Sequence, residues 1–247
     1  MRSPSRGRTA SRWAWAASPP TPSRQRSTPA CPSTTGATSL WFPDSGDCRT
    51  CWWSTTTCRR VPPELIALAR SRPGGRQLSY ASAGAGTTLH LSGAMFAQTI
   101  GAPMLHVPYR GGAPAMVDVI AGRVDMIFDN IPGALAQARQ GKVRPLAVTG
   151  RERNATAPDI PAVAEHLPGF EIVSWTCLSA PAGLPMGMAA RMNALTRQAL
   201  AGEELRRSFE DLGATPWWTT QEDLEAYRAA QEAALRPLIL ASGARVE

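Results

Sequence analysis

Residues 79–148 alternate short apolar runs with longer segments in which apolar residues recur at helical spacing. The apolar runs predict strands, one beginning at Ser79 and others at 105–107, 124–128 and 143–148. The segments between them predict helices after Thr88, over 113–121 and ending at 137–141. Strand, loop and helix in repetition indicate a parallel α/β sheet.

The flanking regions are predicted to be mainly helical. A helix is expected over Glu64–Arg70, a loop over the polar, Pro-containing residues 150–162, and a strand over 170–178. Three helices are expected to follow, at 188–200, 203–212 and 221–235, and Pro237 should break or kink the last of them. In the first of the three, the inward side chains are expected to be Met192, Leu195 and Leu200.

Candidate binding chemistry lies where three of the predicted strands end. The small-residue turn Ser82–Gly86 runs into Thr87-Thr88, and Gly at two of its positions permits φ > 0 and close backbone approach. Thr is a good N-cap, and such a helix start offers unbonded N–H groups and a positive dipole end to an anion. The loop 108–112 and Asp129-Asn130 also follow strands, and ligands of parallel sheets bind at these ends.

Several separate motifs carry a family resemblance. They are YASAGAGTTLHLSG, HVPYRGGAPAMVDVIAGRVDMIFDN, GKVRPLAVTG, PDIPAVAE and SWTCLSAPAGLP, in this order along residues 80–185. Together they resemble the extracytoplasmic solute receptors of tripartite tricarboxylate transporters, the Bug-type periplasmic binding proteins. The resemblance covers about residues 61–247.

The resemblance implies an α/β fold of the type II periplasmic-binding-protein kind, in which two lobes with βαβ sheets close on a small carboxylate or dicarboxylate. Residues 61–147 would form the second ligand-binding lobe, and 148–247 the C-terminal part of the first lobe. The first strand, first ligand loop and first hinge strand of the family pattern have no recognisable counterpart. The first lobe is therefore expected to be incomplete, and this truncated chain to bind its ligand weakly or not at all.

Family receptors hold a ligand carboxylate largely with main-chain N–H groups and hydroxyls of such loops. The matching positions in this chain are Ser82, Gly84, Ala85, Gly86, Thr87 and Thr88. His90 is either a ligand contact or a satisfied histidine on a helix face. Arg110 suits bidentate contact with a carboxylate or a structural salt bridge. Asp129 and Asn130 suit an amine or a water-mediated hydroxyl.

The net charge of +7 is confined to one end of the chain. Residues 1–60 hold nine Arg and two Asp, whereas residues 61–247 hold 17 basic and 17 acidic residues. An evenly basic protein would suggest a nucleic-acid or membrane partner. Because residues 61–247 are neutral overall, we expect no nucleic-acid partner for them. The resemblance implies that the receptor hands its ligand to the membrane permease subunits of the transporter, and we expect it to be a monomer.

Residues 1–60 are rich in Arg, Ser, Pro and Thr and admit three interpretations. The first is a disordered basic arm. The second is a metal site on Cys48, Cys51 and Cys58, which lacks the second paired motif or His that zinc sites use. The third, which we favour, is translation out of frame. With GC-rich synonymous codons started one base earlier, Cys48–Arg60 permits L-P-(N/H/D/Y)-L-L-V-V-H-H-D-L-P-A, a string typical of this family just before its E-L-I-A-L-A-R helix.

No catalytic set is evident, so we expect no enzyme, no cofactor and no metal site. The three His stand beside no evident nucleophile, and Cys177 in an apolar run is expected to be buried. No membrane span and no convincing signal peptide are present, so periplasmic localisation rests on resemblance. Two alternatives remain: the effector-sensing domain of a regulator, and a nucleic-acid binder that uses the Arg-rich arm.

Overall fold

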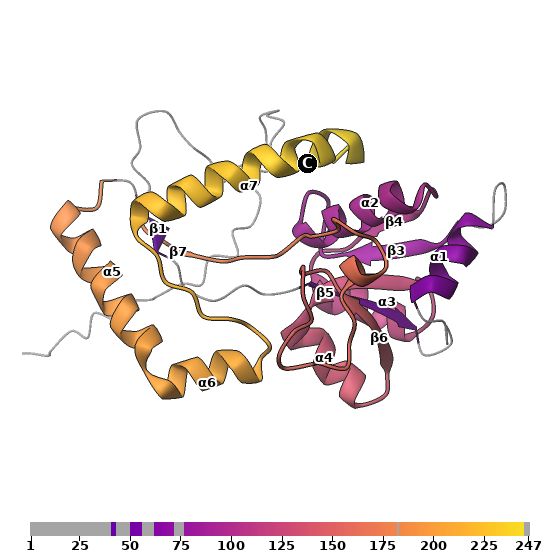
Figure 1. The fold of residues 1–247 in the computed structure, drawn as a ribbon, viewed down its shortest axis with the longest axis horizontal. Helices are drawn as coiled ribbons and strands as arrows, with labels where there is room; N and C mark the ends of the chain where they lie inside the picture. The colour runs from indigo at the N-terminus through magenta and orange to yellow at the C-terminus, as the bar shows by residue number, and fades with distance from the viewer. Residues whose placement is uncertain (1–40, 43–49, 56–61, 72–76, 182, 245–247) are drawn as a thin grey trace, which may run out of the picture.

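The computed structural model describes residues 41–42, 50–55, 62–71, 77–181 and 183–244. A five-stranded sheet carries helices on both faces, and a second, mainly helical group lies beside it (Figure 1). The sheet order is β4-β3-β5-β2-β6, built respectively from Leu105–Pro108, Ser79–Ser82, Met126–Asn130, Thr50–Thr55 and Val143–Val148. The predicted α/β fold class is confirmed.

The sheet is parallel except for one inserted strand. β3 pairs in parallel with β4 and β5, whereas β2 runs antiparallel between β5 and β6. β2 lies inside residues 1–60, where no strand was predicted, so the described sheet includes a strand that precedes residue 61. Its strand conformation follows from pairing with β5 on one side and β6 on the other, which the local sequence TCWWST does not predict.

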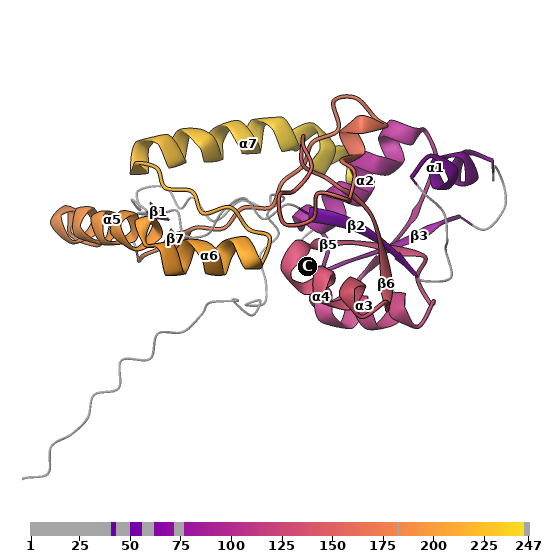
Figure 2. The same cartoon turned by 60° about the horizontal axis from the view of Figure 1, so that its bottom comes forward.

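Helices bury both faces of the sheet, as Figure 2 shows. On one face α1 (Pro62–Arg70) and α2 (Thr88–Ile100) cover a core that includes Tyr80 and Phe128. On the other, α3 (Gly112–Ile120) and α4 (Ile131–Arg139) cover a core that includes Ile127. The apolar residues 126–128 of β5 and 146–148 of β6 are buried, and buried strands have continuous apolar runs, which is why the sequence pattern located these two strands.

The second group contains α5 (Met186–Ala201), α6 (Glu203–Asp211) and a two-stranded ladder of β1 (Trp41–Phe42) with β7 (Leu178–Ser179). α7 (Gln221–Ser242) begins beside this group and extends over α2 (Figures 1 and 2). Its side chains Leu235, Leu238 and Ile239 pack against the core on the α2 face. One helix therefore joins the two parts of the molecule.

Two predictions about the C-terminal helices are wrong. α7 does not stop before Pro237 but continues to Ser242, where Gly243 at φ 65° caps it. A helix can accommodate one proline when tertiary packing beyond it compensates for the lost hydrogen bond. Leu195 was expected to point inward, yet it is 55% exposed on α5, whereas Leu200 is buried.

The strand predicted at 170–178 is also largely absent, because only Leu178–Ser179 form a strand and Ser174 forms an isolated bridge. The apolar alternation is real, since Phe170 and Ile172 are buried. Two hydrogen bonds join Ile172 to Thr149. The Ile172 N–H donates to the Thr149 carbonyl at 3.0 Å. The Thr149 hydroxyl donates to the Ile172 carbonyl at 2.8 Å.

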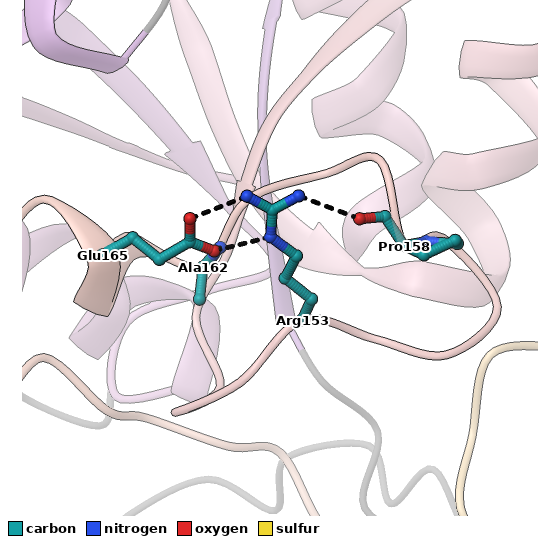
Figure 3. Close-up of polar contacts among 4 residues, drawn as sticks. All are labelled: Arg153, Pro158, Ala162 and Glu165. Atoms are coloured by element: carbon teal, nitrogen blue, oxygen red, sulfur yellow. Dashed lines mark hydrogen bonds and ion pairs between the residues drawn. The ribbon is translucent and has the colours of Figure 1, made fainter.

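The predicted loop at 150–162 is confirmed and is held by an ion-paired clip (Figure 3). Arg153 binds both carboxylate oxygens of Glu165 at 2.7 Å and donates to the Pro158 carbonyl at 3.1 Å. The same carboxylate accepts the Ala162 N–H at 2.8 Å. These donors hold the pKa of Glu165 at about 2, so the clip stays ionised at any physiological pH.

Candidate functional site

The first candidate loop connects β3 to α2 through a tight, internally bonded turn. Ser82 ends β3 fully buried, and Gly84 and Gly86 adopt φ of 139° and 79°, values that favour glycine. Thr87 is the N-cap of α2, and its Oγ1 accepts the His90 N–H at 3.3 Å. The expected strand, turn and N-cap are all present.

Several N–H groups of this loop are already bonded within it. The Gly84 N–H donates to Ser82 Oγ at 3.2 Å, and the Gly86 N–H donates to His90 Nδ1 at 3.1 Å. In the described part of the chain, no acceptor is recorded for the N–H groups of Ala85, Thr88 and Leu89 or for the Thr88 hydroxyl. Of the six predicted loop positions, Ala85 and Thr88 therefore present donors, while Ser82, Gly84, Gly86 and Thr87 shape the loop.

The second loop, 108–112, packs directly against the first. The Tyr109 N–H donates to the Ser82 carbonyl at 3.0 Å, and the Gly111 N–H donates to the Ala83 carbonyl at 3.2 Å. The Tyr109 hydroxyl donates to Asp118 at 2.7 Å and anchors the loop on α3. Arg110 at its tip is exposed, with no ion pair recorded among the described residues, so the predicted structural salt bridge is not observed.

The third element, Asp129-Asn130, ends β5 and starts α4. The Asn130 N–H donates to Asp129 Oδ1 at 2.9 Å, and a Cβ placed on Gly112 would lie 3.0 Å from that same oxygen. Asp129 thus sits against the start of α3. Burial raises the pKa of its carboxyl group to about 6. The Asn130 Oδ1 is buried and has no hydrogen-bond partner within the described residues.

A stack of three aromatic rings packs against the first loop. His90 lies on His106 with ring centroids 3.9 Å apart, and His106 lies on Tyr80 at 4.9 Å. His106 Nε2 is 2.7 Å from Ser82 Oγ. Burial and the neighbouring His90 lower the pKa of His106 to about 4, and burial also lowers the pKa of His90. Both rings are therefore neutral at pH 7.

His106 and Tyr109 were missed by reasoning from sequence. His106 reaches the loop because the parallel register sets it opposite Tyr80, a pairing that no local pattern reveals. Among the described residues, no cluster of three or more His, Cys, Asp or Glu can hold a metal ion. Cys177 had been expected to be buried, but the structure shows it half-buried.

The predicted site residues thus gather at one edge of the sheet, where β3, β4 and β5 end. A second group of helices lies beside the sheet, and α7 joins the two parts, which is a two-lobed arrangement. The sequence profile of the tripartite tricarboxylate transporter family receptor, TctC, matches residues 58–243. The chain belongs to this family, whose members are solute-binding receptors and not enzymes.

Individual relatives agree with this assignment. A UPF0065 protein encoded in the tcbD-tcbE intergenic region of Pseudomonas sp. strain P51 is 40% identical over 152 residues, which is 61% of this chain and 45% of the relative. Protein BugT of Bordetella pertussis is 29% identical over 184 residues, 74% of this chain and 56% of BugT. The chain therefore spans about half the length of the curated relatives it matches.

Solved structures show the same fold. Rpa4515 of R. palustris, solved with adipate, matches 83% of this chain and 70% of its own with a TM-score of 0.77 and 28% identity. The periplasmic binding protein BugD matches with a TM-score of 0.74 and 27% identity over 84% of this chain and 70% of BugD. MatC of Rhodopseudomonas palustris, solved with malate, matches with a TM-score of 0.72 and 25% identity over 81% of this chain and 69% of MatC. Within the described residues no helix is both long and apolar enough to span a membrane.

Proposed function

We propose that this chain is an extracytoplasmic receptor that binds a small carboxylate and delivers it to the permease of a tripartite tricarboxylate-type transporter. The observation that carries the proposal is the start of α2, where main-chain donors of Ala85, Thr88 and Leu89 stand unbonded beside the Thr88 hydroxyl. The adipate and malate in the similar structures support a dicarboxylate as the ligand class.

One ligand carboxylate would bind at the start of α2. Each hydrogen bond to a charged group contributes about 1.5–3 kcal/mol, and the positive end of the helix dipole adds to it. Arg110 is exposed, and its chain neighbours Tyr109 and Gly111 both bond to the first loop. Its positive charge would therefore attract the anion toward that loop. Its planar guanidinium suits bidentate contact with a carboxylate.

Asp129 and Asn130 would take a different role. A carboxylate there opposes binding of an anion at short range, and Asp129 already accepts the Asn130 N–H. The unpartnered Asn130 Oδ1 is an acceptor, so it favours a ligand that carries a hydroxyl or ammonium donor besides its carboxylates. We therefore expect a hydroxy- or amino-substituted dicarboxylate to bind more tightly than a plain one.

The affinity is expected to be low in this chain. A second ligand loop from the first lobe has no counterpart among the described residues, so one loop has to supply most of the donors. Two or three such hydrogen bonds, reduced by desolvation of the anion, correspond to a Kd nearer millimolar than micromolar, about −4 kcal/mol. The receptor would act in the periplasm, as BugD does.

Backbone NMR of the full chain during addition of malate or adipate tests the proposal. The amide signals of Ala85, Thr88 and Leu89 should shift with a common millimolar Kd, and the neutral analogue adipamide should leave them unchanged. If the shifts centre on other residues, or if adipamide produces the same shifts, the proposed site is wrong.

Two variants at one position divide the contributions. Thr88→Val removes the hydroxyl and keeps the N–H, whereas Thr88→Pro removes both. Proline is favoured at the first position of a helix, and the extended Thr87 (φ −70°, ψ 158°) suits a residue before proline. We expect binding to fall about tenfold or more at each step, because each step removes one charge-assisted hydrogen bond. Thr99→Val, at the exposed far end of α2, is the matched control.

A further inference from the structure

We propose that His90 is a positioning residue, whose unprotonated Nδ1 accepts the Gly86 N–H and keeps the 84–88 loop in its anion-binding conformation. The proposal rests on the proposed function for the role of the loop. The hydrogen bond itself, at 3.1 Å, joins a ring that is only 4% exposed to a main-chain group in the middle of the turn. The small exposed fraction of His90 favours support of the loop over direct contact with the ligand.

His90 binds the loop twice. Its side chain accepts from Gly86, and its own N–H donates to the N-cap oxygen of Thr87 at 3.3 Å. Gly86 adopts a φ of 79°. Because glycine can adopt several other conformations as well, a hydrogen bond from outside the turn is needed to select this one. With Gly86 held by His90, the neighbouring N–H groups of Ala85 and Thr88 keep no recorded acceptor among the described residues.

The second histidine extends this support to the start of the loop. His106 lies against His90 with ring centroids 3.9 Å apart, and its Nε2 is 2.7 Å from the buried Ser82 Oγ. Ser82 in turn accepts the Gly84 N–H at 3.2 Å. The stacked pair therefore fixes Gly84 through Ser82 and fixes Gly86 directly, which covers both glycines of the turn.

The hydrogen bond requires one tautomer of one protonation state. Because Nδ1 accepts, the neutral His90 ring carries its proton on Nε2. Protonation of the ring would place a second N–H against that of Gly86 and release the loop. Among the described residues, the titratable groups that face His90 are His106 from β4 and Tyr80 from β3. The described end of α7 that lines the same groove contributes Ala241, Ser242, Gly243 and Ala244, none of which titrates. Solvent reaches the rings through a groove of about 500 Å³ along α2.

Acidification should therefore weaken the site. Burial lowers the pKa of His90 below its ordinary 6.5, so the bond is intact at pH 7 and is lost as the pH falls through the lowered value. In the full chain without ligand, NMR should find His90 in the Nε2–H tautomer at pH 7. The Gly86 amide signal should then titrate with the His90 ring. The proposal is overturned if NMR finds the Nδ1–H tautomer of His90, or if the Gly86 amide signal does not change as His90 titrates.

Variants separate positioning from simple stability. His90→Asn offers an amide oxygen near the place of Nδ1 that does not titrate, and His90→Leu offers no acceptor. Malate binding should be nearly unchanged and less dependent on pH in His90→Asn, but about tenfold weaker or worse in His90→Leu. Ligand protonation is common to both proteins, so the difference between wild type and His90→Asn isolates His90. His166→Asn, at an exposed histidine, is the control.

The outcomes are distinguishable. If malate and adipate do not bind any form, the proposed function fails, while the tautomer and the Gly86 titration still decide the role of His90. If His90→Leu does not fold, the wild-type titration and His90→Asn decide it. Equal loss of Gly86 amide protection in His90→Asn and His90→Leu would show that the ring matters for packing and not as an acceptor.

Discussion

At the scale of single residues, the ring of Tyr80 lies against the one position in the middle of α2 that has no side chain. A Cβ placed on Gly93 would lie 2.1 Å from Tyr80 Cε2, far inside contact distance. The Tyr80 ring stacks on His106, and His106 bonds to Ser82 at the start of the loop. The glycine at position 93, which leaves room for the Tyr80 ring, therefore helps to shape the 84–88 loop.

Gly93→Ala should therefore destabilise the protein despite its better helix propensity. Alanine in a helix gains about 1 kcal/mol over glycine, but forcing the Tyr80 ring aside costs about 1–3 kcal/mol and disturbs the stack. Denaturant unfolding should show a net loss, together with shifted His106 ring signals. Gly187→Ala is the matched control on α5, where a Cβ meets no atom within 4 Å and stability should not fall. Equal stability of wild type and Gly93→Ala would contradict this packing.

The buried Asp129 carboxyl group should make stability depend on pH. Its pKa is raised to about 6 in the folded protein, above the value near 3.9 for an unfolded chain. The folded state binds the proton more tightly, so this contribution is fully present below about pH 4 and is lost as the pH rises through about 6.

Asp129→Asn should accordingly increase the free energy of unfolding at pH 7 by up to about 2 kcal/mol and change it little at pH 4. Urea unfolding of both proteins across this range measures the difference, and the other titrating groups cancel in the comparison. A variant that is less stable than wild type at pH 7 would mean that the ionised carboxylate is held favourably by the start of α3.

At the scale of secondary structure elements, α7 connects the two parts of the molecule and contains a proline where helices seldom tolerate one. Pro237 lies between Leu235 and Leu238, both of which pack on the α2-face core. Both leucines are half-buried, and since full burial of one leucine contributes about 1.5–3 kcal/mol, their combined packing offsets the missing hydrogen bond. Packing, not local propensity, therefore determines where α7 ends.

Pro237→Ala should stabilise the protein by about 1–3 kcal/mol, because an interior proline costs about 3 kcal/mol relative to alanine and the surrounding helix has partly adapted to it. Thermal or denaturant unfolding measures the gain. Arg236→Ala, at the preceding exposed position, is expected to be neutral and serves as the control. Loss of stability in Pro237→Ala would show that a bend at Pro237 is needed to seat Leu238 and Ile239 on the core.

At the scale of the whole molecule, the sheet contains a strand from the part of the chain that least resembles a globular protein. β2 pairs Cys51 with Asp129 of β5 and with Val148 of β6, beside the candidate site. An interior strand is usually rich in aliphatic residues. Read one base earlier, this stretch permits L-L-V-V in place of Cys51-Trp52-Trp53-Ser54.

We propose that the sequence before about residue 60 is out of frame. Sequencing of the coding DNA through codon 70 is expected to reveal a single-base change that joins the two frames near Arg60. The joined frame should encode the apolar strand string and remove most of the +7 charge. If no single-base change joins the frames, the proposal is wrong, and the salt dependence of nucleic-acid binding by the Arg-rich arm becomes the next measurement.

Much of the fold was predictable where local pattern and tertiary environment agree. The apolar residues 126–128 of β5 and 146–148 of β6 are buried and identify these strands, and Thr87 identifies the start of α2 by its N-cap chemistry. Residues 170–177 alternate like a strand but form no strand ladder among the described residues, and α7 continues through its proline. Those failures share a cause, because long-range packing overrode a local signal.

The sequence alone determined the class of fold, the family and the edge of the sheet where the candidate site residues lie, since periodicity, turn residues and motif order are local properties. Only the tertiary structure decided which donors of the loop remain available. The Gly84 and Gly86 N–H groups are bonded to Ser82 and His90, and His106 reaches Ser82 across the parallel register of β3 and β4. Hydrogen-bond partners depend on distances between residues far apart in the chain, and sequence spacing does not encode those distances directly.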